Sequence, residues 1–332
     1  MNAIYTINLQ LFAGTLNTQT TLLNGEGNNL SPEMKTFYDM TLIDEASAQL
    51  VHDQFGQKRP IPANGGKRIE FRKFDNLPDA MTPLTEGVTP DGNKLNVSTI
   101  EATVDQYGDY IVQSDVLELT SIDNTIVEAT KILGKQAGST LDAVVRGVLA
   151  AGTNVLFSGG KNKRGDLTAA DTLSVQDVKK AVAILRANNA PTINGDYVAI
   201  IHPYAAYDLM SDEKWVEAHK YAKPENLYTG EIGKIAGVRF VETSNATVYE
   251  GAAGNVFCTI ILGEGAYGVT EITGGGLQTI VKQKGSAGTG DPLDQRSSVG
   301  WKALKTAERL VENYMIRIES IGEFSANVTP NA

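Results

Sequence analysis

The glycine-rich segment Gly263–Gly268 comes closest to a chemical motif, because it reads G-x-G-x-x-G directly after an apolar run. In dinucleotide-binding proteins this pattern joins a strand to a helix whose N-terminus receives the pyrophosphate. The residues that follow it here, Val269–Ile272 and then three consecutive glycines, predict a strand and a turn. No helix N-terminus would face a phosphate, so a nucleotide-binding oxidoreductase is kept only as an alternative function.

The histidines and the cysteine form no recognisable catalytic or metal-binding arrangement. His52, His202 and His219 are scattered, without H-x-x-x-H spacing or a companion cysteine, so no zinc site is predicted. The single cysteine, Cys258, lies in an apolar run and is expected to be a buried free thiol. No G-x-S-x-G elbow or P-loop occurs. We therefore expect no enzyme and no cofactor.

Six basic residues in one stretch indicate binding rather than catalysis. They are Lys58, Arg59, Lys67, Arg68, Arg72 and Lys73, in a chain whose formal net charge is −10. A solvated face would explain them without any function. The functional hypothesis is contact with an acidic neighbour, such as another copy of the same chain. On that hypothesis, the candidate inter-subunit contacts are Lys67, Arg68, Arg72 and Lys73.

Length and composition limit the possible classes of protein. A chain of 332 residues exceeds what one core usually serves, so two or more lobes are expected. The net charge argues against a nucleic-acid binder, which needs clustered lysine and arginine, but suits a protein that encloses DNA without binding it. No run of 18 apolar residues occurs, so no membrane span is predicted, and the opening residues lack a signal peptide's positive region.

Residues 1–30 predict a flexible N-terminal arm. They mix a short apolar patch, which includes Ile7, Leu11 and Phe12, with Thr, Asn, Gly and Gln. Such a segment becomes ordered only by lying on another surface. Ile7, Leu11 and Phe12 are therefore further candidate contacts between subunits.

A helix and a long hairpin are predicted next. The helix covers residues 31–56, starting at Ser31-Pro32 and ending at Gly56. Apolar and polar residues then alternate through residues 57–118, and Pro90-Asp91-Gly92 is a strong turn signal. The two limbs are too polar to be buried on both faces, so we expect a hairpin that projects from the body.

The longest periodic segment, residues 119–152, predicts an amphipathic helix with apolar residues at steps of three and four. About 30 helical residues span roughly 45 Å, whereas a compact chain of this size has a radius of gyration near roughly 20 Å. An ordinary core helix is the simpler interpretation. The alternative is a spine that carries separate lobes.

The remaining residues predict helices and strands that are segregated rather than regularly alternating, which favours the α+β class. A second helix is predicted at 174–185 and another after Pro203. Strands are predicted at 197–201, 238–241, 256–262, 267–272, 277–282, 299–304 and 312–319.

This order of elements resembles the major capsid protein of tailed bacteriophages, which has the Hong Kong 97-type fold. IPANGGKRIEFRKF (61–74) and PLTEGVTPDG (83–92) are similar to the extended loop of the branch named after the coliphage N4 capsid protein. GEIGKIAGVRFVET (230–243) and SVGWKALKTAERLVENYMIRIES (298–320) resemble its axial lobe and its closing strands.

The resemblance implies a division of the chain. Residues 57–118 would be the extended loop, 119–171 with 296–324 the peripheral domain built on the spine helix, 172–295 the axial domain, and 325–332 a C-terminal tail.

It also implies a structural protein that self-assembles into hexamers and pentamers, forming the icosahedral head around the double-stranded DNA of a phage or prophage. Its location would be the virion capsid, after assembly in the bacterial cytoplasm. A portal and a separate scaffolding protein would be partners, since about 30 arm residues cannot act as a scaffold. An encapsulin-like bacterial shell that houses an enzyme is the alternative within the same fold.

Overall fold

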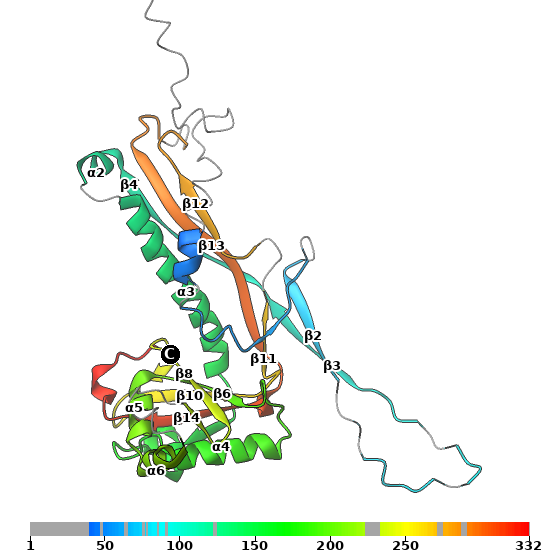
Figure 1. Cartoon of the computed structure of the whole chain (residues 1–332). Helices are drawn as coiled ribbons and strands as arrows, with labels where there is room; N and C mark the ends of the chain where they lie inside the picture. Colours follow the sequence, from blue (N-terminus) through cyan, green and yellow to red (C-terminus); the bar gives the residue numbers. More distant parts are fainter. Residues whose placement is uncertain are drawn as a thin grey trace, which may run out of the picture. The chain divides into compact units, whose positions relative to one another are not determined.

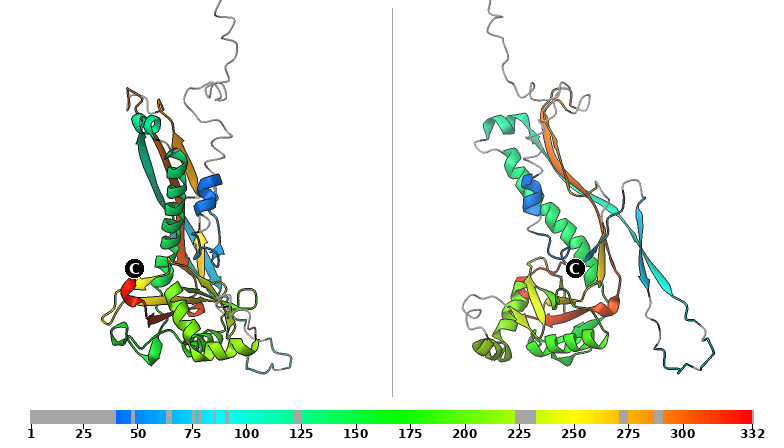
Figure 2. Two further views of the ribbon diagram at one scale, coloured as in Figure 1. Left: turned by 60° about the vertical axis from the view of Figure 1, so that its left-hand side comes forward. Right: turned by 45° about the vertical axis from the view of Figure 1, so that its right-hand side comes forward.

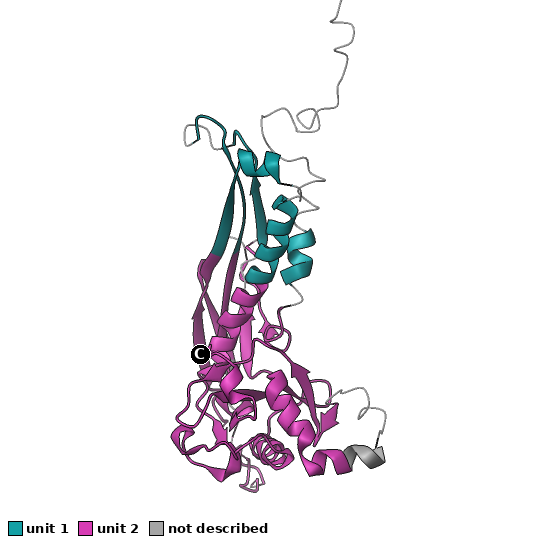
Figure 3. Cartoon of the chain, turned by 90° about the vertical axis from the view of Figure 1, so that its left-hand side faces the viewer, with its two compact units in different colours: residues 1–47, 108–137, 277–302 teal, residues 48–107, 138–276, 303–332 magenta. Residues whose placement is uncertain are grey.

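The computed structural model describes residues 40–46, 49–62, 66–74, 77, 79–84, 86–89, 92–121, 125–222, 233–270, 275–286 and 291–331. The chain divides into two compact units (Figure 3). Unit 1 comprises residues 1–47, 108–137 and 277–302, and unit 2 comprises residues 48–107, 138–276 and 303–332.

Unit 1 contains strands that lie beside a helix. Strand β4 (Asp105–Ser114) pairs with β13 (Arg296–Arg309), and β12 (Gln278–Lys282) lies antiparallel to β13 (Figure 1). The short helix α2 (Asp115–Thr120) follows β4, and α3 (Thr125–Ala150) begins in this unit. Strands β4 and β13 and helix α3 all continue into unit 2.

A chain of hydrogen bonds ties α3 to two strands of unit 1, β4 and β13. Gln136 of α3 donates through Nε2 to Asp109 Oδ2 of β4 at 2.6 Å, and its Oε1 accepts from Trp301 Nε1 of β13 at 3.3 Å. One amide side chain thus satisfies groups from two strands.

Helix α3 confirms the predicted long helix. Its apolar stripe is buried: Ala129, Leu133, Ala137, Leu141, Val145 and Leu149. The helix proper runs for 26 residues, and residues 119–120, which were predicted to start it, belong to α2. The last turn of α3 has no basic residue. Instead, Arg309 Nη1 donates to Val148 O at 3.1 Å, and Tyr249 Oη donates to Ala150 O at 2.7 Å, which satisfies carbonyls that every helix end leaves free.

Unit 2 is built on a seven-stranded sheet with the order β5-β14-β10-β6-β8-β7, in which β9 also pairs with β10. These strands are β5 (Val155–Phe157), β6 (Tyr197–Ile201), β7 (Lys234–Ile235), β8 (Val238–Glu242), β9 (Val248–Tyr249), β10 (Val256–Leu262) and β14 (Met315–Ile321). Every residue of β6 and β10 is buried, as their unbroken apolar runs predict for central strands.

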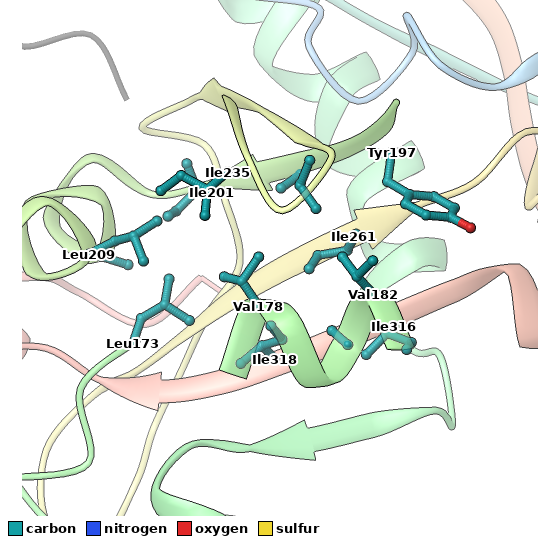
Figure 4. Close-up of a cluster of buried hydrophobic side chains, with 14 of the residues drawn as sticks. Leu173, Val178, Val182, Tyr197, Ile201, Leu209, Ile235, Ile261, Ile316 and Ile318 are labelled. Atoms are coloured by element: carbon teal, nitrogen blue, oxygen red, sulfur yellow. The ribbon is translucent and has the colours of Figure 1, made fainter. Parts of the chain in front are cut away.

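Three helices accompany this sheet: α4 (Val175–Ala187), α5 (Pro203–Ser211) and α6 (Glu213–Ala222). Val178 and Val182 of α4 point toward Ile316 and Ile318 of β14 within the main hydrophobic core (Figure 4). Ser174 is the N-cap of α4, because its side chain accepts a hydrogen bond from Asp177 N at 3.3 Å, and this fixes the start of the helix at Val175.

The hairpin also belongs to unit 2. Strands β2 (Arg68–Phe74) and β3 (Val97–Thr103) are antiparallel and extend away from the rest of this unit (Figure 2). At the hairpin's root, β1 (Gln57–Lys58) lies parallel to β11 (Tyr267–Thr270), which in turn pairs with the C-terminal part of β13. The predicted hairpin is therefore confirmed in its central part, while residues from Asp105 onward leave it to form β4 and α2.

The helix predicted for residues 31–56 is shorter than expected. Residues 40–46 are helical, but 49–56 are not. The backbone N–H groups of Val51 and His52 donate to Asp142 Oδ1 at 2.9 and 2.8 Å, and these bonds replace helical ones. The predicted start at Ser31-Pro32 lies outside the described residues.

The strand pairing also differs from the division expected from the sequence. Strands β5 and β14 were expected in a peripheral domain, yet they pair in the sheet of β10 and β6. Strand β12 was expected in the axial domain, yet it pairs with β13 in unit 1. Strand partners depend on contacts between distant residues, which a local pattern does not encode.

The C-terminal residues, expected to form a tail, are held by specific bonds. Asn331 Oδ1 accepts from Val248 N at 2.8 Å, and its Nδ2 donates to Ala246 O at 3.1 Å. Arg146 Nη2 donates to the carbonyl of Asn331 at 2.9 Å. The segment is thus fixed on unit 2 as far as residue 331.

Candidate assembly surface

His52 and Asp53, which precede the hairpin in the sequence, are held in place within unit 2 by buried polar groups. His52 and Asp142 are both fully buried, and His52 Nδ1 lies 2.8 Å from Asp142 Oδ2. Asn245 Nδ2 donates to the same carboxylate oxygen at 2.8 Å. Burial pushes the pKa of Asp142 upward, but the hydrogen bonds from His52 and Asn245 outweigh it and leave the pKa below its usual value. The carboxylate therefore holds the hairpin's root in its charged form.

A second clamp lies one residue further on. Lys305 of β13 is buried, and its Nζ lies 2.8 Å from Asp53 Oδ1. The hydroxyl of Tyr267 donates to the carbonyl of His52. The start of the hairpin is thus bound to α3, β11 and β13 by charged or buried partners, and removal of one of them would leave another unpaired.

The glycine-rich motif has a packing role in this structure. Gly268 lies in β11, and a Cβ there would lie 2.6 Å from the Phe71 ring of β2, so only glycine lets that ring sit against the strand. A Cβ at Gly263 would lie 2.8 Å from the carbonyl oxygen of Pro191, and Gly265 has a φ of +71°. Strand β11 begins at Tyr267, within the motif, so the motif leads into a strand and not into a helix N-terminus.

The hairpin alternates between a buried face and a polar face. Cross-strand partners Phe71 and Ile100 lie on the inner face, where Phe71 is 3% exposed. On the outer face, Glu70 lies directly opposite Glu101, and Arg68 and Arg72 flank Glu70 along β2. Like charges in directly opposite positions are unfavourable, so the flanking arginines offset a repulsion within the hairpin.

The predicted basic residues are therefore not a continuous positive patch. Arg68 Nη1 lies 3.7 Å from Glu101 Oε2, and Lys58 Nζ lies 3.5 Å from Asp53 Oδ2. Both ion pairs are largely exposed on the basic side and contribute little to stability. Lys67 and Arg72 are exposed, and Lys73 lies in β2 with its side chain outside the described part. Residues 57–104 hold seven basic and six acidic residues, so the charges of this segment nearly balance.

The distal part of the hairpin exposes large apolar side chains that sequence reasoning missed. They are Leu77, Met81, Leu84, Val88, Leu95 and Val97, with exposed fractions from 46% to 85%. Single exposed apolar residues are ordinary, but six within 21 residues of one projecting segment indicate an interaction surface. The signal was present in the sequence as apolar residues between prolines, too widely spaced for a helix or strand of its own.

The remaining candidate residues lie elsewhere. His202 caps α5, and its Nδ1 accepts from Tyr204 N at 3.2 Å. Cys258 is a buried free thiol, as predicted, and burial raises its pKa. His219 lies in α6 with its side chain outside the described part, and Ile7, Leu11 and Phe12 lie outside the described residues altogether.

The described residues contain neither a candidate metal-binding cluster nor a candidate membrane span. Among them, no group of three or more His, Cys, Asp or Glu side chains is placed to hold a metal ion. Within the same residues, no helix combines the length and apolar character that crossing a membrane requires.

Together, the long helix, the hairpin and the sheeted unit define a phage-capsid fold of the Hong Kong 97 type. The chain belongs to the phage capsid protein family, whose model matches residues 118–289. It is a major capsid protein, a structural component of the phage head.

Solved structures agree on the fold. The capsid of Cyanophage P-SCSP1u superposes with a TM-score of 0.64 at 16% identity, covering 81% of this chain and 87% of the other. The capsid of Ralstonia phage GP4 superposes with a TM-score of 0.63 at 15% identity, covering 85% of this chain and 90% of the other. A virus-like particle from Pyrococcus furiosus superposes with a TM-score of 0.50 at 14% identity, covering 86% of this chain and 99% of the other. A search of curated proteins finds no match.

Proposed function

We propose that copies of this chain assemble into hexamers and pentamers that close an icosahedral shell, with the hairpin lying on a neighbouring subunit. The observation that carries the proposal is the hairpin's exposed apolar segment, Leu77 to Val97, on a root held firmly by the clamps at His52 and Asp53. A rigid root with an apolar tip loses little conformational freedom when another copy covers it.

The proposal also assigns a role in the shell to each segment of the chain. The hairpin within residues 57–104 serves as the extended loop. The peripheral domain is drawn from 119–171 with 296–324 and the axial domain from 172–295, except that β5 and β14 join the axial sheet and β12 joins β13. Lys67, Arg68, Arg72 and Lys73, with Ile7, Leu11 and Phe12 of the arm, contact neighbouring copies. The similarity of residues 61–74 and 83–92 to the N4-like branch supports placing the chain there.

The proposal also covers the shell's partners, its place of assembly and its contents. A portal and a separate scaffolding protein join the shell during assembly in the host cytoplasm. The net charge of −10 supports a shell that encloses double-stranded DNA without binding it specifically. The chain acts as a structural, non-catalytic protein.

The test is electron microscopy of the full chain, purified alone and after co-expression with a scaffolding protein. Closed particles tens of nanometres across are expected, built from many identical weak contacts, roughly as multivalent assemblies are. A chain that stays monomeric under both conditions would contradict the proposal.

A second candidate is a shell that houses an enzyme rather than a genome. The fold also covers 99% of the chain of a virus-like particle from Pyrococcus furiosus, so the fold alone is shared by shells that are not named as phage capsids. Particles purified from the native host distinguish the two functions, because they contain either packaged DNA or a co-purifying enzyme.

A further inference from the structure

A cavity lies at the root of the hairpin, and no side chain among the described residues fills it. Its volume is about 230 Å³, and it opens between the hairpin and the turn before β14. The lining is mostly apolar or aromatic, from Phe71, Ile100, Leu310, Val311 and Tyr314, together with Gln57 and Gly265. Arg59 and Arg72, both exposed, lie at the same cavity and give it a positive margin.

Helix α2 presents the complementary surface. It has no buried residue, although three of its six residues are apolar. Val116, Leu117 and Leu119 are 62%, 47% and 80% exposed. At about 100° per residue these three side chains span about 160° of the helix surface. Asp115 lies about 40° from Leu119, at the edge of this apolar arc, and Glu118 lies on the opposite side.

The charges on the two surfaces are opposite. Asp115 and Glu118 are acidic and α2 itself contains no basic residue, whereas the cavity's margin carries two arginines. Glu118 is already bonded to Lys284 Nζ at 2.9 Å, so Asp115 is the carboxylate that a second molecule would engage. An apolar knob with an acidic border thus matches an apolar cavity with a basic border.

We propose that α2 of one copy docks in this cavity of a second copy, with Leu119 among the cavity's apolar residues and Asp115 beside Arg59 or Arg72. The inference rests on the proposed shell function and names the partner surface for the hairpin's root. The contact joins two different patches, so it is head-to-tail and closes into a ring when the rotation between copies permits.

Charge reversal tests the docking directly. Asp115→Lys alone, or Arg59→Glu with Arg72→Glu, places like charges together and is expected to lower the yield of assembled particles at least tenfold. The triple variant restores opposite charges and is expected to recover most of the wild-type yield. A triple variant that assembles no better than either parent, or parents that assemble like wild type, would overturn the proposal.

Disulfide trapping supplies a second measurement on the full chain. One preparation carries Leu119→Cys and another carries Val311→Cys, and the native Cys258 does not interfere because it is buried. Mixing them under oxidising conditions is expected to yield a linked dimer. Ile132→Cys is the matched control, since Ile132 is 61% exposed on α3. Linkage no greater than with the control would reject the docking.

These outcomes are separable from failure of the shell function. Wild-type particles in the micrograph establish the shell whatever the variants do. Particles that form normally with reversed charges would keep the shell function and remove only the α2 contact.

Discussion

Phe71 lies against Gly268 so closely that a Cβ on the glycine would stand 2.6 Å from a ring carbon. The contact joins β2 of the hairpin to β11 at its root. A sequence motif that suggests nucleotide binding is therefore required here by the packing of an aromatic ring.

Replacing Gly268 with alanine is expected to displace the Phe71 ring and destabilise unit 2 by about 1–3 kcal/mol, the usual cost of overpacking. Hydrogen exchange of the amides in β2 and β3 measures the loosening. Gly147→Ala is the control, because a Cβ there meets nothing within 4 Å and the helical position should gain about 0.5–1 kcal/mol. Equal effects of the two substitutions would show that the ring contact is unimportant.

Asp142→Asn is expected to lower the free energy of unfolding by about 2–4 kcal/mol at pH 7, since a buried, multiply bonded carboxylate loses its charge. The pKa of Asp142 is lowered in the folded chain, so the stabilisation is present above the unfolded pKa of about 3.9 and is lost as pH falls through the folded pKa. Urea unfolding of the wild type and of Asp142→Asn at pH 7, 5 and 3 should show that the difference in free energy of unfolding between them persists at pH 5 and shrinks at pH 3. A difference that vanishes already at pH 5 would contradict this assignment.

Asp208 is expected to behave in the opposite way. Burial raises its pKa to about 6, and its Oδ1 accepts only a long bond from Glu323 N at 3.4 Å. The folded chain therefore favours the protonated acid, and stability falls as pH rises from about 4 through 6. Asp208→Asn should raise the melting temperature at pH 7.5 and leave it nearly unchanged at pH 4. Destabilisation at pH 7.5 would mean that the charged form is needed.

Replacing Met81 and Leu84 together with serine should leave the monomer as stable as wild type, because both are exposed, at 85% and 78%. Assembly should fall several-fold, since the hairpin would lose apolar area that a neighbour covers. Particle yield by sedimentation is the readout. Ile184→Ser on α4 is the control, and an equal loss with that variant would argue against a specific role for the hairpin's distal part.

Reversing Arg68, Arg72 and Lys73 to glutamate should impair assembly while the circular-dichroism spectrum stays that of wild type. The charges are on the hairpin, and Arg68 makes only an exposed ion pair. A lost spectrum would instead show that these residues hold the fold, because Glu70 and Glu101 lie opposite each other and need nearby cations.

Much of the fold was predictable from local patterns. The apolar runs at 197–201 and 256–262 became central strands with the expected bounds, and Ser174 capped the helix that its position indicated. The long helix followed from its periodicity. These elements depend on neighbours within a few residues, which is the information that a sequence pattern carries.

The errors involve residues far apart in the chain. The helix expected to reach Gly56 stops early because Asp142, 90 positions away from His52, binds the backbone there. The alternation of Arg68 and Arg72 with Glu70 and Glu101 became visible only once the β2–β3 register was known. The hairpin's apolar tip was missed because exposure depends on the absence of a covering element.

The bonding of Asn331 has a practical consequence for engineering. Its side chain and carbonyl are held beside β9 and by Arg146, so the backbone leaves the subunit from a fixed position. A peptide or fluorescent domain attached at this residue would therefore start from the same place on every copy, and in the proposed shell the attachment points would recur at regular intervals.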